Sequence, residues 1–306
     1  MSQSPTIADA PCRAANATQA GSYRAVFGES AIWSEADGGV WWVDMHGHAL
    51  LLTRPDGTTR LWKTPGPELP WARAVVLRES GGLLVALSDR LHAFDPVSGS
   101  FSLLPITFDL PRGHLFNDAA VDPQGRLIIG TMLPGRGNDG RAIIVQLDLD
   151  GRVRQLAEGM GTTNGLAFSP DGRTIYFSDS QVDVRKLWAA PYDPATGLMG
   201  QSRLFIDFSN LPGKPDGAAM DSEGCLWLAA MASRWLHRFT SDGRLDLSLE
   251  LPIDTPTRPC FGGPGLATLF TTSGGLKSGE TDDGLKGGLF QMASPVSGLA
   301  AWACRL

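Results

Sequence analysis

Apolar and polar positions follow one another along this chain in a pattern that returns six times. A short apolar run leads into a turn that resembles D-x-x-G, and a second apolar run follows at once. Two such runs joined by a tight turn are typical of a pair of antiparallel strands. The six pairs begin near Ile32, Val75, Ala119, Leu166, Ala218 and Cys260.

Most of these pairs are followed by another strand pair, such as ALLLTRPDGTTRLW from Ala49. A unit of four strands in roughly 40–50 residues is typical of a propeller blade. Six units fill the chain, so we predict an all-β protein: a single six-bladed β-propeller over residues 21–306, with about four antiparallel strands per blade. Residues 1–20 are expected to form a loose extension, and Tyr23–Phe27 to add the outer strand of the last blade.

The six units can be aligned on the residue before each turn, and the positions four residues earlier are all polar. In a propeller, the innermost strand of every blade starts at the same face, beside the central channel. We therefore expect a polar ring at the mouth of this channel. Strand-initiating residues are also polar for purely structural reasons, because they cap or turn the chain. The ring positions are Glu29, Arg73, Asn117, Asn164, Asp216 and Thr257.

Two carboxylates in a narrow channel repel one another unless a cation or a proton lies between them. Glu29, Asn164 and Asp216 would offer only oxygen donors to such a cation. This chemistry suits Ca²⁺, Mg²⁺ or Mn²⁺, and Zn²⁺ also accepts carboxylates. The sequence thus predicts one divalent metal ion, with an incomplete protein shell that leaves room for water or substrate.

Around these residues the chain resembles the senescence-marker-protein, gluconolactonase and regucalcin-like family of six-bladed propellers. The resemblance spans about residues 21–295 and rests on motifs in a fixed order. These are GESAIW at Glu29, FNDAAVDPQGRLIIGTM at Asn117, TNGLAFSPDGRTIYFSDS at Asn164, PDGAAMDSEGCLW at Asp216, and CFGG at Cys260.

The resemblance implies a metal held by Glu29, Asn164 and Asp216, with Asn117 contacting metal-bound water or substrate. It also implies hydrolysis of a sugar-acid lactone to the open acid, in which Asp216 accepts a proton from the attacking water. A metal ligand is a weak base, so these two roles of Asp216 compete. The alternative is attack by hydroxide generated at the metal, with Asp216 as a ligand alone.

The chain departs from the regucalcin pattern where that pattern carries sugar contacts. Leu115 stands where an arginine is expected, and Leu133–Gly135 where an acidic residue is expected. Arg73, in contrast, is either a structural partner of a nearby acid or a clamp for an anionic group on the substrate. The remaining candidates for substrate contact are Asn117, His46, His114, Arg136, Thr257 and Arg258.

Composition and charge narrow the choice of partners. A formal net charge of −6 and the absence of a Lys/Arg run argue against a nucleic-acid surface. No apolar stretch has the length of a membrane span, and residues 1–20 lack the basic start and apolar core of a secretory signal. We therefore expect a cytoplasmic enzyme, a monomer or weak homo-oligomer, acting on a small sugar lactone.

Two other function classes stay open at this point. The same metal centre would serve a propeller hydrolase of other esters or organophosphates, and a strongly apolar channel mouth would favour that function. A non-enzymatic metal-binding protein or scaffold is the other alternative. Scaffolds of the WD-repeat kind carry no acid pair in the channel, so Glu29 and Asp216 argue for the enzyme.

Overall fold

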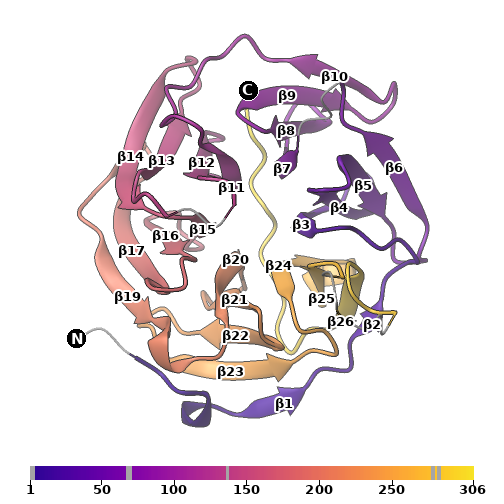
Figure 1. Cartoon of the computed structure of the whole chain (residues 1–306), viewed down its shortest axis with the longest axis vertical. Helices are drawn as coiled ribbons and strands as arrows, with labels where there is room; N and C mark the ends of the chain where they lie inside the picture. Colours follow the sequence, from indigo (N-terminus) through magenta and orange to yellow (C-terminus); the bar gives the residue numbers. More distant parts are fainter. Residues whose placement is uncertain (1–3, 67–70, 136–137, 277–279, 281–283) are drawn as a thin grey trace.

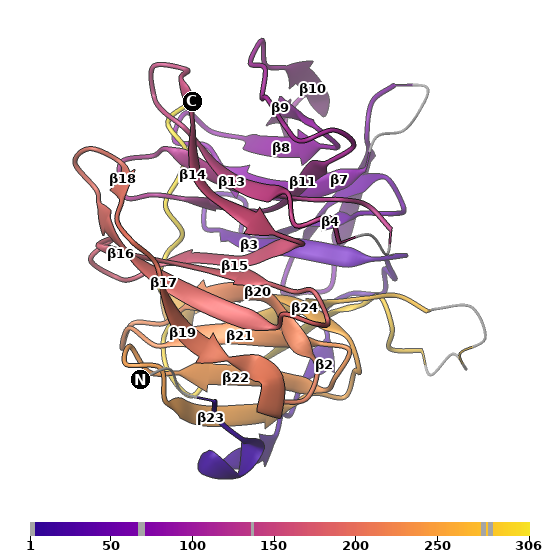
Figure 2. The same cartoon turned by 60° about the vertical axis from the view of Figure 1, so that its left-hand side comes forward.

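In the computed structural model, six small sheets stand around a central channel and form a six-bladed β-propeller (Figure 1). The structure describes residues 4–66, 71–135, 138–276, 280 and 284–306. Figure 2 shows the same sheets side by side from a second direction. The predicted fold class is confirmed.

The first three blades each have four strands in chain order. Blade 1 holds β3 (Gly28–Ser34), β4 (Gly39–Asp44), β5 (Ala49–Thr53) and β6 (Thr59–Lys63). Blade 2 holds β7 (Ala72–Leu77), β8 (Leu83–Leu87), β9 (Arg90–Asp95) and β10 (Ser100–Leu103). Blade 3 holds β11 (Leu115–Val121), β12 (Leu127–Met132), β13 (Ala142–Leu147) and β14 (Val153–Met160).

The other three blades vary at their outer edges. Blade 4 holds β15 (Thr163–Phe168), β16 (Thr174–Asp179) and β17 (Lys186–Asp193), and β17 pairs with both β18 (Leu198–Met199) and β19 (Arg203–Asp207). Blade 5 holds β20 (Lys214–Met220), β21 (Leu226–Met231), β22 (Trp235–Phe239) and β23 (Leu245–Glu250). Blade 6 holds β24 (Pro256–Gly262), β25 (Thr268–Ser273) and β26 (Leu289–Ala293). The described residues also include the short 3-10 helices η1 (Ile7–Asp9), η2 (Phe208–Asn210) and η3 (Pro264–Leu266).

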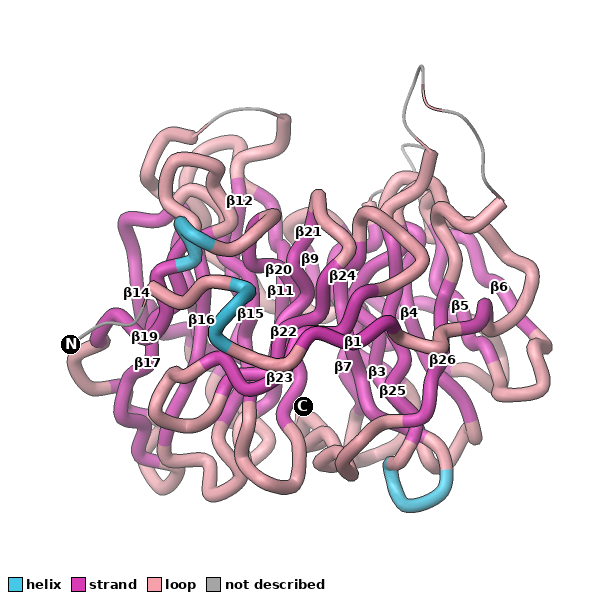
Figure 3. The backbone as a smooth tube through the Cα atoms, turned by 90° about the horizontal axis from the view of Figure 1, so that it is seen from below, coloured by secondary structure: helices cyan, strands magenta, loops and turns pink. Residues whose placement is uncertain are grey.

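The N-terminal segment closes the ring. β2 (Thr18–Gln19) pairs antiparallel with β26 and supplies the outer strand of blade 6. This closing strand lies a few residues before the predicted segment Tyr23–Phe27, whose backbone instead reaches the carboxylate of Asp44 through the amides of Val26 and Phe27. β1 (Cys12–Ala14) adds a parallel fifth strand to blade 5, and Figure 3 shows it beside β23 in the side view.

The turns between the first two strands of a blade depend on aspartate and glycine. In blade 3, the carboxylate of Asp122 accepts hydrogen bonds from the amides of Gln124 and Arg126 at 2.9 and 2.8 Å. Gly125 follows with φ of 87°, a conformation that costs little without a Cβ atom. This local chemistry explains why the D-x-x-G turns could be recognised in the sequence.

The core lies between neighbouring blades. Successive side chains of a strand point to opposite faces of its sheet, and in a propeller both faces are covered. Trp41 and Trp42 on β4 illustrate this: Trp41 packs with Val85 and Phe94 of blade 2, and Trp42 packs with Phe270 of blade 6. Burial on both faces explains the continuous apolar runs of the inner strands.

Among the described residues, no helix has the length and apolar character that a membrane-spanning helix requires. The four cysteines are free thiols, and only Cys12 is exposed.

Candidate active site

All six predicted ring residues lie on the innermost strand of their blades, at the same structural feature. In every blade, the pairing of the inner strand with the second strand shifts register at this position, which is the mark of a β-bulge. A bulge bends the strand and places consecutive side chains on the same side of it. The shifts fall between Glu29 and Ile32, Ala72 and Ala74, Phe116 and Ala119, Asn164 and Ala167, Pro215 and Ala218, and Pro256 and Pro259.

The acids of the ring lie close enough to affect one another's ionisation. Burial and the negative charge of Asp118 raise the pKa of Glu29 from 4.5 to about 7, while Arg258 and Arg73 oppose the rise. Burial and the charge of Glu29 raise the pKa of Asp216 well above its ordinary value. The charge of Glu29 therefore acts on Asp216, and the charges of Asp118 and Arg258 act on both acids.

The oxygen Oδ2 of Asp216 is buried and has no hydrogen-bond partner among the described residues. A buried carboxylate oxygen without a partner is costly, so it indicates an interaction that the described residues do not supply. Within the part of the chain that the structure describes, no group of three or more His, Cys, Asp or Glu side chains could hold a metal ion. The predicted donor set contains only two such side chains, Glu29 and Asp216, and its third donor would be the amide oxygen of Asn164.

The two carboxamides of the ring are hydrogen-bonded to each other. Nδ2 of Asn117 donates to Oδ1 of Asn164 at 3.0 Å and to the carbonyl of Thr163 at 2.9 Å. Nδ2 of Asn164 donates to Oγ of Ser180 at 2.8 Å. Both amides are thus held in a defined orientation beside the acid pair.

Arg73 is almost completely buried, with 2% of its surface exposed. Its Nε donates to the carbonyl of Phe116 and its Nη2 to Oδ1 of Asn117, both at 2.7 Å, and it also contacts the sulfur atoms of Met45 and Met132. Burial lowers the pKa of Arg73 to about 10, against the opposing effect of Glu29. Its partners in the structure are therefore neutral groups of blades 1 and 3.

A second layer of side chains lies one residue further along the same strands. Asp118 pairs with Nη1 of Arg258, which joins blade 3 to blade 6 across the channel. Asp118 also accepts a hydrogen bond from the amide of Leu166 at 2.8 Å. A Cβ atom at Gly217 would lie 2.3 Å from Cδ of Arg258, so only glycine leaves room for the crossing arginine.

Sequence reasoning missed Asp118. The motif F-N-D places it directly after Asn117, and in a regular strand neighbouring side chains point to opposite faces. The bulge between Phe116 and Ala119 removes that alternation. The recurrence of this shift in every blade has no counterpart in the hydrophobic pattern, which is why it could not be anticipated from the residue types.

The other predicted substrate contacts occupy different surroundings. Oγ1 of Thr257 donates to the carbonyl of Gly28 at 2.7 Å, which ties blade 6 to blade 1. His114 is buried, and its Nε2 lies 3.1 Å from Oδ1 of Asp139. The ring of His46 lies 5.1 Å from that of Trp71, and partial desolvation and the charge of Arg73 lower its pKa. Arg136 lies outside the described residues.

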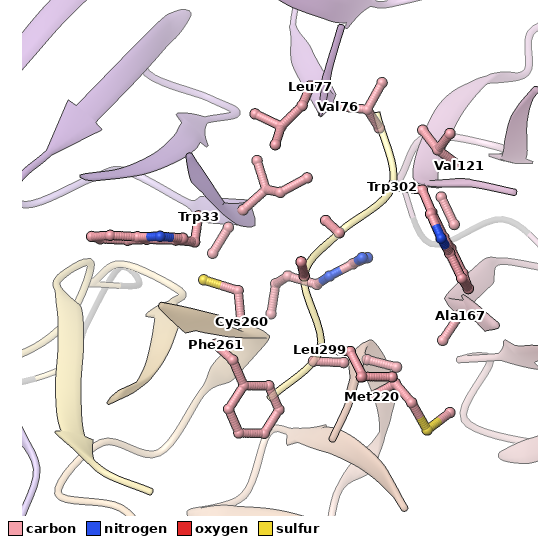
Figure 4. A pocket seen from close by; sticks show the side chains of 18 of the residues that line it. Trp33, Val76, Leu77, Val121, Ala167, Met220, Cys260, Phe261, Leu299 and Trp302 are labelled. Atoms are coloured by element: carbon pink, nitrogen blue, oxygen red, sulfur yellow. The ribbon is translucent and has the colours of Figure 1, made fainter. Parts of the chain in front are cut away.

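The far end of the channel has the opposite character. A cavity of about 580 Å³ is lined there mainly by apolar residues, including Trp33, Leu77, Val121, Phe168, Met220 and Phe261. The C-terminal segment crosses this end, with Leu299 and Trp302 in the wall of the cavity (Figure 4). The segment is held by backbone bonds from Leu299 to Met220 at 3.2 Å and from Cys304 to Leu77 at 2.7 Å.

The fold and the ring define a class of protein: a six-bladed propeller in which several blades contribute polar side chains to one end of the channel. The family model described as SMP-30/gluconolactonase/LRE-like region matches residues 27–275. The chain belongs to this family, as its motifs predicted.

Two relatives with assigned activities are similar over most of their length. A 6-deoxy-6-sulfogluconolactonase of Pseudomonas putida is 34% identical over 250 residues, which cover 81% of this chain and 83% of the relative. A pentonolactonase of Haloferax volcanii is 31% identical over 84% of this chain and 85% of its own. Among solved structures, a calcium-binding regucalcin of Agrobacterium tumefaciens matches with a TM-score of 0.87 and 28% identity, covering 97% of this chain and 100% of that one.

Proposed function

We propose that this protein is a divalent-metal-dependent lactonase, which hydrolyses the lactone of a sugar acid to the open-chain acid. The observation that carries the proposal is the buried Oδ2 of Asp216, which has no hydrogen-bond partner in the described part of the chain and lies within the electrostatic influence of Glu29. An acid pair with raised pKa values and a free oxygen fits a cation better than it fits any group of the protein. The lactonase activities of the two relatives support the reaction class.

In this proposal, Glu29, Asn164 and Asp216 hold the cation. The donor set of two carboxylates and one amide oxygen suits Ca²⁺, Mg²⁺ or Mn²⁺ and also accommodates Zn²⁺. When bound, such an ion polarises the lactone carbonyl and lowers the pKa of water in the site.

Asp216 is also our candidate for the catalytic base. Its pKa is raised by burial and by Glu29, so its carboxylate is a better proton acceptor than an exposed aspartate. It would take a proton from the water that attacks the lactone carbonyl, and the departing ring oxygen would be protonated as the ring opens. A bound cation works against this by lowering the same pKa.

For the substrate, we propose contacts with Asn117, Arg73, His46 and His114 at the ring end of the channel, with Arg136 as a further candidate. Thr257 and Arg258 are further candidates, although the hydroxyl of Thr257 donates to Gly28 and Nη1 of Arg258 pairs with Asp118.

An anionic group on the sugar would be attracted by Arg73, whose contacts with two methionine sulfurs are weak enough to exchange. The sulfosugar substrate named for the Pseudomonas relative supports this part of the proposal. We further propose a cytoplasmic enzyme, a monomer or weak homo-oligomer, with no nucleic-acid or membrane partner.

The test is a pH-indicator assay of acid release from aldono-, aldaro- and sulfosugar lactones. Metal-stripped protein is assayed alone and with each divalent ion restored. Asp216→Asn should lose the activity, whereas Asp183→Asn, which removes the same charge from an exposed position, should keep it. Turnover that is independent of metal, or no turnover on any lactone, would contradict the proposal.

A further inference from the structure

Asn164 can serve a cation only if its amide oxygen, and not its nitrogen, faces the acid pair. We propose that Ser180 and Arg73 are positioning residues that fix this orientation from the two ends of one hydrogen-bond chain. The inference rests on the proposed function, because it concerns the amide donor of the proposed cation site.

The chain of hydrogen bonds runs through four neighbouring blades, whose inner strands β7, β11, β15 and β20 follow one another around the channel (Figure 1). Arg73 donates to Asn117, Asn117 donates to Asn164, and Asn164 donates to Ser180. Ser180 in turn donates to the carbonyl of Pro215, the residue before Asp216.

The end at Pro215 fixes the direction of the chain. A backbone carbonyl can only accept, so the single hydroxyl proton of Ser180 is committed to it. Oγ of Ser180 can therefore only accept from Asn164, and a carboxamide donates through its nitrogen alone. The nitrogen of Asn164 must face Ser180, and its oxygen must face the other way.

The end at Arg73 fixes the same direction independently. A guanidinium group can only donate, so it demands the oxygen of Asn117 and leaves the nitrogen of that amide for Asn164. Arg73 is itself immobilised by burial and by its bond to the carbonyl of Phe116. A donor-only group and an acceptor-only group thus agree on the orientation of both amides.

Ser180 is well placed to act on Asn164 because its own backbone is held. Its amide donates to the carbonyl of Thr162 at 3.0 Å. The carboxylate of the preceding Asp179 accepts from the amides of Gly161, Thr162 and Gln181 at 2.8 to 3.0 Å. The hydroxyl is therefore presented to Asn164 from a rigid corner of blade 4.

The consequence concerns the lone pairs of Asn164. Its oxygen accepts one hydrogen bond, from Asn117, and an amide oxygen has two lone pairs, so one stays available for a cation. In the flipped orientation, an NH₂ group would face the cation and repel it. Partners that orient a ligand in this way typically change metal affinity by about 10–100-fold when they are removed.

The experiment measures metal binding by titration calorimetry on metal-stripped, full-length protein, with Ca²⁺, Mg²⁺, Mn²⁺ and Zn²⁺ in separate runs. Ser180→Ala removes the hydroxyl and should weaken binding by about 10–100-fold. Ser178→Ala is the matched control, because Ser178 is fully buried on β16 but its Oγ has no partner in the described structure. This control should change affinity by less than about threefold, and Ser180→Thr, which keeps a hydroxyl, should restore most of the binding.

Arg73→Lys tests the other end at constant charge, because a lysine cannot hold Phe116 and Asn117 together through a planar fork. A positioning role predicts weaker metal binding and a loss of turnover on neutral lactones as well as on anionic ones. Unchanged metal binding, with a loss of turnover on anionic lactones alone, would overturn this role for Arg73 and leave only its contact with the anionic group.

The outcomes separate this inference from the proposed function. If the unaltered protein binds no divalent ion, the metal site itself is wrong. If it binds an ion and Ser180→Ala binds it equally well, only the orienting role is wrong. Thermal melts of each metal-free variant show whether a loss of binding reflects a loss of folding.

Discussion

The ion pair between Asp118 and Arg258 offers the sharpest test of the channel's physical character. The side chain of Asp118 is 5% exposed and that of Arg258 is 13% exposed, so water screens this pair only slightly. Asp118→Ala would leave Arg258 without its partner. Removing one member of a buried pair costs about 3–5 kcal/mol, because the other charge stays buried.

The same substitution also frees the amide of Leu166, which loses its hydrogen bond to Oδ2 of Asp118. An unsatisfied buried donor costs about 1–3 kcal/mol. These two contributions overlap, and the loss of Asp118 also relieves its repulsion of Glu29, so we expect the free energy of unfolding to fall by about 3 kcal/mol. Arg258→Met should cost less, because the carboxylate of Asp118 keeps the amide donors of Ala119 and Leu166.

Urea unfolding of the metal-free protein, followed by tryptophan fluorescence, measures these changes. The comparison is Asp150→Ala, which breaks the exposed pair with Arg152 and should cost less than about 1 kcal/mol. A cost for Asp118→Ala as small as that of Asp150→Ala would refute the reasoning. It would mean that water fills the channel and screens the pair.

Three further predictions concern other parts of the channel. Folding raises the pKa of Glu29 from 4.5 to about 7, so between these pH values Glu29 keeps a proton in the folded protein that it loses in the unfolded chain. The free energy of unfolding of the metal-free protein should therefore decrease as pH rises from about 5 to 7.5. This rise in pKa corresponds to about 3 kcal/mol of stability. In urea unfolding, the stability of Glu29→Gln should depend less on pH than that of the unaltered protein. An equal pH dependence in both proteins would contradict the raised pKa of Glu29. Gly217→Ala should lower the thermal midpoint by several degrees, because its new Cβ would collide with Arg258, and an unchanged midpoint would show that the arginine can move aside. Trp302→Ala should lower the free energy of unfolding in urea by about 2 kcal/mol, because the indole packs edge-on against Phe168 with ring centroids 6.1 Å apart. An unchanged free energy would mean that the C-terminal segment contributes little to closing the channel.

The fold could be predicted from the sequence because each blade repeats the same local chemistry. Asp122 and Gly125 show how one turn is specified by an aspartate cap and a glycine with positive φ. The ring followed from the fold, because equivalent positions of equivalent strands meet around the channel. The sequence alone could therefore predict that Glu29 and Asp216 belong to one ring at the channel.

Other features depend on main-chain geometry that residue types do not encode. The strand that closes the ring, Thr18–Gln19, has only two residues, too few to show an alternating pattern. The C-terminal segment is held largely by its backbone, as in the bond from Cys304 to Leu77. The orientation of Asn164 depends on Ser180 and Pro215, which are brought together only in the folded ring.

The charged groups of the ring and of the layer below it suggest what the site is built to stabilise. The carboxylates of Glu29, Asp118 and Asp216 outnumber the guanidinium groups of Arg73 and Arg258 by one. A divalent cation would reverse this balance and leave one positive charge in excess. When Asp216 accepts the proton of the attacking water, the negative charge would pass from its carboxylate to the carbonyl oxygen of the lactone, and the total charge of the site would not change. The new oxyanion would then lie among groups with an excess of positive charge, which favours the transition state over the neutral substrate.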